Sequence, residues 1–282
     1  MIPPPPWHFA GEALWVTCRV EPSAAAAFLP PGLRPGPDAG AAAIGFYDWQ
    51  WCTDSGRELR DPVTAQFREC LIVLDCELDG RPAGRVPYAW VDAAVPMLRG
   101  FIQGMPKLFG SVWLSRSFPV GRAGPRRGPG ADFSAVASAG GRLVATATVT
   151  LTGPIDQPPP LADRPLVHTR HFPAWEPGED ARAELVQAST SGVEFADIWC
   201  GDATLEVHDT GDPDLAALAL GGDGRGYVFS YAETLAPGRR VGPSAAPDGQ
   251  RRTGRSAWAR RSRMVAAASS MTSGRRPRAT LM

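Results

Sequence analysis

Lys107 is set apart from the rest of the chain by its residue type. The 282 residues contain 29 lysines and arginines, and because Lys107 is the only lysine, the other 28 are arginines. An arginine stays protonated in a protein and therefore cannot act as a nucleophilic amine. Lys107 is either an ordinary surface charge or an amine placed for chemistry. Its apolar neighbours Met105, Leu108 and Phe109 favour the second interpretation, because charged side chains are rarely buried without a function or partner.

The chemistry that only an amine provides is the formation of an imine with a ketone or keto acid. An ordinary lysine has a pKa of about 10.4, so about one molecule in 2,500 carries a free amine at neutral pH. Burial in an apolar pocket disfavours the ammonium form and lowers that pKa. The protonated imine then acts as an electron sink for making or breaking a neighbouring carbon–carbon bond.

Other polar residues near Lys107 in sequence have two interpretations each. Gln103 either orients a substrate carbonyl or carboxylate or bonds the end of its own helix. Arg99 either binds a carboxylate through its planar fork or forms a surface ion pair. Tyr227 and Tyr231, four residues apart on one expected strand, share a face; they either donate a proton to an intermediate or pack in the core.

The stretch Gly104-Met-Pro-Lys-Leu-Phe-Gly110 resembles the Gly-x-Pro-Lys-x-x-Gly signature of the acetoacetate decarboxylase superfamily. In that superfamily this motif presents the imine-forming lysine, a known case of an activated amine. The resemblance begins at Pro-Pro-Pro-Pro-Trp-His-Phe (3–9). It continues through 29–33, 67–69 and 226–231, and covers most of residues 1–235.

The resemblance implies a fold and further site residues. It implies an α+β, mainly antiparallel β structure, in which a cone-like barrel carries short flanking helices. Glu69 lines up with a family active-site glutamate that would shuttle protons near the imine, whereas the alternative is an ion pair with Arg68. The substrate pocket is expected to include the side chains of Tyr47, Arg99, Met105, Leu108, Phe109, Tyr227 and Tyr231.

Several positions depart from the decarboxylase pattern. The second lysine that follows the imine lysine in the family is Leu108 here. The family's N-terminal arginine falls near Gly11 or Glu12, and a second glutamate aligns with Tyr47. We therefore expect a lysine imine with a small keto acid, with pyruvate-type aldol condensation and dehydration favoured over decarboxylation of acetoacetate. A non-catalytic β-barrel that binds a small ligand is the alternative of another class.

The elements that must position these residues read mainly as strands. Phe67–Leu78 has near-alternating character and ends at the turn Asp79-Gly80, and residues 96–103 read as a short helix with Pro96 in its first turn. Many strands with turn-rich connections predict an antiparallel sheet curled around a core. Further strands are expected at 14–20, 42–52, 86–91, 133–138, 142–152, 165–172, 183–189, 203–208 and 226–233, with short helices at 23–28 and 213–220.

The charge distribution predicts one domain followed by a tail. Residues 239–282 hold eleven arginines and one acid, Asp248, a net of +10, so residues 1–238 carry −10. We expect a single domain over 1–237 and a disordered tail over 238–282. An Arg-rich tail is compatible with nucleic-acid binding, but no nucleic-acid motif accompanies it, so we expect no such partner.

The remaining expectations concern compartment, cofactors and assembly. No apolar run is long enough to cross a bilayer, and no secretory signal is present. Five cysteines without a Cys-x-x-Cys pair indicate reduced thiols in a cytoplasmic protein. His168 and His171 lie three apart in an expected strand, so they leave opposite faces, and we expect no metal and no cofactor. A homo-oligomer is expected from the resemblance alone.

Overall fold

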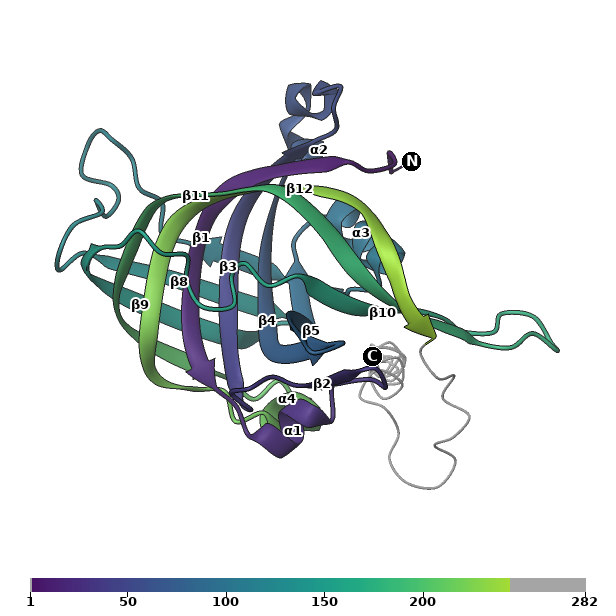
Figure 1. The fold of residues 1–282 in the computed structure, drawn as a ribbon. Coiled ribbons are helices and arrows are strands. Elements are labelled where there is room, and N and C mark those ends of the chain that lie inside the picture. The colour runs from purple at the N-terminus through teal and green to yellow at the C-terminus, as the bar shows by residue number, and fades with distance from the viewer. Residues whose placement is uncertain (1, 244–282) are drawn as a thin grey trace, which may run out of the picture. The chain divides into compact units, whose positions relative to one another are not determined.

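A computed structural model describes residues 2–243, which lie within one compact unit, Met1–Ala245. The expected disorder of residues 244–282 lies outside the described residues. The fold is α+β and dominated by strands, as predicted (Figure 1). The strands are β1 (Trp7–Arg19), β2 (Leu33–Pro35), β3 (Ala41–Cys52), β4 (Gln66–Leu78), β5 (Arg81–Val91), β6 (Lys107–Phe109), β7 (Ser111–Leu114), β8 (Asp132–Ala139), β9 (Arg142–Pro154), β10 (Leu166–Phe172), β11 (Arg182–Val207) and β12 (Gly221–Pro243). The helices are α1 (Pro22–Ala26), a 3-10 turn (Arg57–Arg60), α2 (Pro62–Ala65), α3 (Ala94–Gln103) and α4 (Pro213–Ala217).

All twelve strands of residues 2–243 belong to one sheet that curls into a ring. Its spatial order is β10-β5-β4-β3-β1-β12-β11-β9-β8-β7. Because β10 also pairs with β11, the strands from β10 to β11 in this order form a closed ring. Most pairs are antiparallel; β5 pairs in parallel with β10 and with β6. Figure 1 shows β1, β3, β4 and β5 side by side, with β11 and β12 curving across. Closure pairs β10, which would otherwise be an edge strand, on both sides, and the sheet continues past β11 to end at β7.

Both faces of the central strands are buried, which explains their nearly continuous apolar sequences. On β3, Ile44 and Phe46 point into a core cluster shared with Val149 of β9. The alternate residues Tyr47 and Trp49 point into a second, aromatic-rich cluster. The site lies on the side of this second cluster.

Helix α3 follows β5 and carries two of the polar residues singled out above. It contains Pro96 near its start and ends at Gly104, whose φ of 80° is the left-handed conformation that glycine adopts without strain. A Cβ at Gly104 would lie 2.5 Å from the backbone nitrogen of Arg170, and one at Gly100 would lie 2.8 Å from Cγ of Lys107. The two glycines therefore let α3 pack directly against β10 and the lysine.

Three details differ from the predicted elements. Lys107 is the first residue of the short strand β6, which is not among the strands expected from the sequence. β11 runs without a break through residues 190–202, and β12 continues six residues past the predicted boundary at 237. Register shifts along the β11–β12 pair let both strands continue through glycine and polar residues. Within residues 2–243, no helix is long and apolar enough to cross a membrane.

Candidate active site

Lys107 and Glu69 form a buried ion pair inside the ring. The Nζ of Lys107 lies 2.8 Å from Oε1 of Glu69, and each side chain is only 7% exposed. Lys107 on β6 pairs with Ala89 of β5, and Glu69 on β4 pairs with Val91 of the same strand. Pairing of both strands to β5 therefore fixes the amine next to the carboxylate.

Burial lowers the pKa of Lys107 below its ordinary value, and desolvation of the ammonium is the largest cause. The negative charge of Glu69 opposes this shift, and the positive charge of Arg99 adds to it. A lowered pKa increases the share of neutral amine at a given pH. Glu69 is in position to accept the proton that the lysine must lose before it attacks a carbonyl.

Arg99 of α3 is held in a cage of aromatic rings and is only 1% exposed. Its guanidinium carbon lies 4.3 Å from the ring centre of Trp51, 4.8 Å from that of Phe9 and 5.3 Å from that of Phe67. Among the described residues, neither Nη1 nor Nη2 has a hydrogen-bond partner. Burial lowers the pKa of Arg99 to about 10, so it remains charged at neutral pH. A planar fork with unbonded N–H groups suits a carboxylate.

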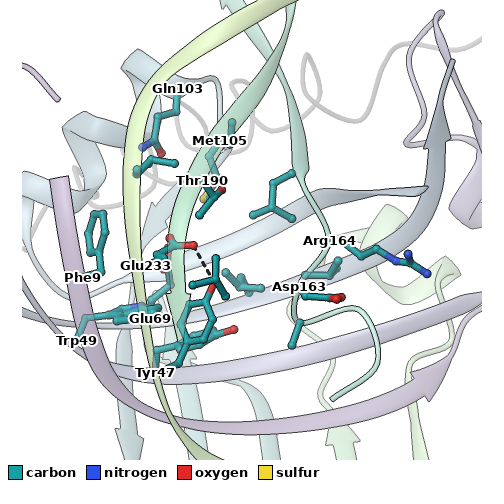
Figure 2. A pocket seen from close by; sticks show the side chains of 18 of the residues that line it. Phe9, Tyr47, Trp49, Glu69, Gln103, Met105, Asp163, Arg164, Thr190 and Glu233 are labelled. Carbon is teal, nitrogen blue, oxygen red and sulfur yellow. Dashed lines mark hydrogen bonds between the residues drawn. The ribbon is translucent and has the colours of Figure 1, made fainter. Parts of the chain in front are cut away.

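Lys107 and Arg99 both line a cavity of about 120 Å³. Figure 2 shows lining side chains from β1, β3, β4, α3, β11 and β12 together with Asp163 and Arg164, of which Arg164 points away from the others. The cavity combines aromatic walls with ionisable groups of both signs. Its polar and aromatic lining consists of Phe9, Trp15, Tyr47, Trp49, Phe67, Glu69, Arg99, Gln103, Lys107, Asp163, Arg164, His168, Thr190, Tyr231 and Glu233.

Glu233 is a cavity carboxylate that the sequence analysis missed. Its Oε2 accepts a 2.9 Å hydrogen bond from the Tyr231 hydroxyl (Figure 2). Burial raises the pKa of Glu233, and the negative charge of Glu69 adds to this effect. Glu233 is therefore the group in the cavity best suited to hold a proton as an acid. Because alternate residues of a strand share a face, Glu233 lies on the same face of β12 as Tyr227 and Tyr231. The strand periodicity of the sequence could therefore have identified it.

The cavity also contains His168, Asp163, Arg164 and Thr190, which were not predicted as site residues. His168 was considered only as a metal ligand. These residues come from β10, from β11 and from the segment before β10. No sequence pattern links these segments to Lys107.

Seven predicted residues line the cavity and three do not. Lys107, Glu69, Gln103, Arg99, Met105, Tyr47 and Tyr231 are brought together. Leu108 packs on the opposite core cluster, because neighbours in an extended strand leave opposite faces. Phe109 is 58% exposed at the end of β6, and Tyr227 is buried in the aromatic-rich cluster near the start of β12. Neither residue lines the cavity.

Comparisons with known proteins give a consistent result. The sequence profile of the family described as acetoacetate decarboxylase (ADC) matches residues 1–242. The fold is similar to the enduracididine biosynthesis enzyme MppR complexed with pyruvate, with a TM-score of 0.83 and 52% identity, covering 86% of this chain and 93% of that one. MppR complexed with the condensation product of pyruvate and imidazole 4-carboxaldehyde matches with a TM-score of 0.82 and 52% identity, over 85% and 90% of the two chains.

A more distant match is an acetoacetate decarboxylase-like enzyme from Sphingomonas wittichii RW1, with a TM-score of 0.77 and 26% identity over 84% of this chain and 93% of that one. A search of curated proteins gave no match. The profile spans most of the sequence, and the predicted signature lysine lies inside the cavity. The chain belongs to the acetoacetate decarboxylase family.

Proposed function

We propose that this protein forms a Schiff base between Lys107 and a small keto acid, and that it condenses pyruvate with an aldehyde and dehydrates the product. The observation that carries the proposal is the buried contact of the only lysine with Glu69, in the same cavity as Arg99. Within residues 2–243, Nη1 and Nη2 of Arg99 have no hydrogen-bond partner. The complexes of MppR with pyruvate and with a pyruvate condensation product support this choice of substrate.

The first step joins the keto acid to the lysine. Arg99 binds the substrate carboxylate, which places the keto carbon beside Nζ of Lys107. Glu69 accepts a proton from the ammonium across the 2.8 Å contact, and the neutral amine attacks the keto carbon. Glu69 returns its proton to the hydroxyl of the resulting carbinolamine, which leaves as water and gives the protonated imine.

The second step makes the carbon–carbon bond. A cavity carboxylate removes a proton from the pyruvate methyl group, and the imine accepts the electron pair to give an enamine. The enamine carbon attacks the aldehyde carbon, the carbonyl π bond breaks, and its oxygen takes a proton from Glu233, whose raised pKa favours the acid form. Loss of a second proton and of the hydroxyl as water gives the double bond. Hydrolysis of the imine then regenerates Lys107.

The substrate preference is tested by comparing two reactions under the same conditions. Pyruvate with imidazole 4-carboxaldehyde is expected to give a product with new conjugated absorbance, whereas acetoacetate is expected to release little carbon dioxide. Rapid release of carbon dioxide from acetoacetate, with no condensation product from pyruvate, would show that decarboxylation is the preferred reaction. The proposed imine at Lys107 would still stand in that case. Neither reaction, and no imine, would favour the ligand-binding alternative.

We also propose that the enzyme acts as a homo-oligomer. The outward side of α3 presents Leu98, Phe101 and Ile102, which are 50%, 66% and 48% exposed. Contiguous apolar surface of this kind is typical of protein–protein contacts. The buried side of the same helix carries Arg99, so a contact at α3 would also hold the site in place.

A further inference from the structure

His168 is a buried polar residue in the cavity for which the proposed steps have no role. It lies on β10, between β5 and β11, and is 2% exposed. Its ring lines the same cavity as Lys107. Within residues 2–243, Nδ1 has no hydrogen-bond partner. A buried polar atom left unbonded costs free energy, so a partner supplied by a bound molecule would offset this cost.

The imidazole of His168 is neutral across the pH range in which the protein is expected to work. Burial lowers the pKa of His168 to about 3, and the positive charges of Arg85 and Lys107 act in the same direction. A neutral imidazole has one N–H donor and one lone pair. At this pKa the ring does not serve as a proton-accepting base, but its N–H remains available to polarise a carbonyl oxygen. A neutral histidine with a lowered pKa has this electrophilic role in triosephosphate isomerase.

The arrangement of the cavity indicates which oxygen the ring would contact. The keto acid is held by Arg99 on α3 and becomes bonded to Lys107 on β6, so these two elements fix the donor substrate. His168 reaches the same cavity from a third element, β10. A carboxylate can only accept hydrogen bonds and would repel an oxygen that gains negative charge.

We propose that His168 binds the carbonyl oxygen of the aldehyde acceptor by donating a hydrogen bond from its imidazole N–H. This inference rests on the proposed condensation. As the enamine carbon forms the new bond to the aldehyde carbon, the π electron pair moves to the aldehyde oxygen. His168 stabilises that charge, Glu233 delivers the proton, and the imidazole ends the step in its original state.

The test separates the two half-reactions in the variant His168→Phe. Trapping of the pyruvate imine by borohydride is expected to stay within about twofold of the wild type, because Arg99 and Lys107 are unchanged. The kcat of condensation with imidazole 4-carboxaldehyde is expected to fall about 100-fold, the usual effect of removing one donor to a developing oxyanion. His168→Asn and His168→Gln, which keep an N–H donor, are expected to recover part of the loss.

His171→Phe is the matched control, because His171 is on the same strand but does not line the cavity. It should condense like the wild type. Undiminished condensation in His168→Phe, or loss of trapping in proportion to condensation, would overturn the role proposed for His168. A wild-type protein that forms no imine would overturn the proposed function and this inference together.

A measurement on the unaltered enzyme covers the case in which the Phe variant does not fold. The ring nitrogen signals of His168, assigned by comparison with the His168→Gln spectrum, are expected in ¹⁵N NMR to be those of a neutral imidazole at pH 7. They should shift when imidazole 4-carboxaldehyde, which still carries its carbonyl oxygen, is added without pyruvate, and change little with pyruvate alone. Signals that respond equally to both ligands would contradict an acceptor-specific contact.

Discussion

Lys107 is subject to two opposing influences whose balance decides its reactivity. Desolvation lowers its pKa and is the larger effect, whereas the carboxylate of Glu69 at 2.8 Å raises it. The sequence suggested desolvation by Met105, Leu108, Phe109 and the core of the barrel. Of the three residues only Met105 lines the cavity, so the core of the ring provides most of the apolar surroundings. In the proposed mechanism Glu69 serves as the proton acceptor rather than as the cause of activation.

This balance predicts the direction of a pKa change in Glu69→Gln. Removing the negative charge takes away the main stabilisation of the ammonium, so the pKa of Lys107 should fall further. The midpoint for modification of Lys107 by an amine-specific reagent should therefore move to lower pH, with peptide mapping used to exclude the N-terminal amine. Glu77→Gln, on the same strand but outside the cavity, should leave the midpoint unchanged. A higher midpoint in Glu69→Gln would refute this account of the pair.

Arg99 is expected to act in substrate binding rather than in stability. In Arg99→Gln the loss of a charge-assisted contact, about 1.5–3 kcal/mol, should raise KM for pyruvate roughly 10- to 100-fold. Among the described residues, Nη1 and Nη2 of Arg99 have no hydrogen-bond partner, so the substitution breaks no hydrogen bond of these two atoms. The Tm is therefore expected to fall less than the loss of substrate binding would suggest. Steady-state kinetics and thermal unfolding measure the two effects. An unchanged KM would exclude Arg99 as the carboxylate site.

At the scale of elements, helix α3 depends on close contact with the lysine. In Gly100→Ala the new Cβ would lie 2.8 Å from Cγ of Lys107, so the side chain or the helix must shift. We expect imine trapping to slow at least tenfold, although alanine favours a helix more than glycine does. Gly153→Ala is the matched control, because no atom lies within 4 Å of its added Cβ. Equal trapping rates in both variants would show that this contact does not position the amine.

The sequence predicted the local elements better than their pairings. The alternating pattern of residues 67–78 and the proline-initiated helix at 96–103 both correspond to elements of the structure, β4 and α3. The unbroken course of β11 through Ser189–Gly192 was not visible, because these polar residues lack strand periodicity. Pairing with β12 supplies the hydrogen bonds that local propensity does not indicate.

At the scale of the whole ring, closure by β10 determines which distant residues meet. β10 pairs with β5 over only two residues and with β11 over six, and this junction brings His168 to the cavity. A sequence gives no signal for such a short parallel pair. The signature lysine and Glu69 were therefore predictable from motif and alignment, whereas His168, Asp163 and Thr190 depended on tertiary structure.

The expected oligomer can be disrupted from the outside of α3. Phe101→Asp places a charge on the exposed apolar side of this helix without altering a cavity residue. Sedimentation velocity should show the wild type as an oligomer and the variant shifted toward the monomer. Ser134→Asp, an exposed change on β8, should leave the assembly intact. A monomeric wild type would remove the proposed assembly and leave the chemistry of the site unaffected.

The central claim is that Lys107 forms an imine with a keto acid, and borohydride trapping tests it most directly. The protein is incubated with pyruvate and borohydride, digested, and mapped by mass spectrometry, with N-terminal modification scored separately. The account predicts one reduced pyruvate adduct on the peptide containing Lys107, with loss of activity, and no internal adduct or turnover in Lys107→Arg. Full activity in Lys107→Arg, or an active enzyme that pyruvate and borohydride leave unmodified at Lys107, would contradict it.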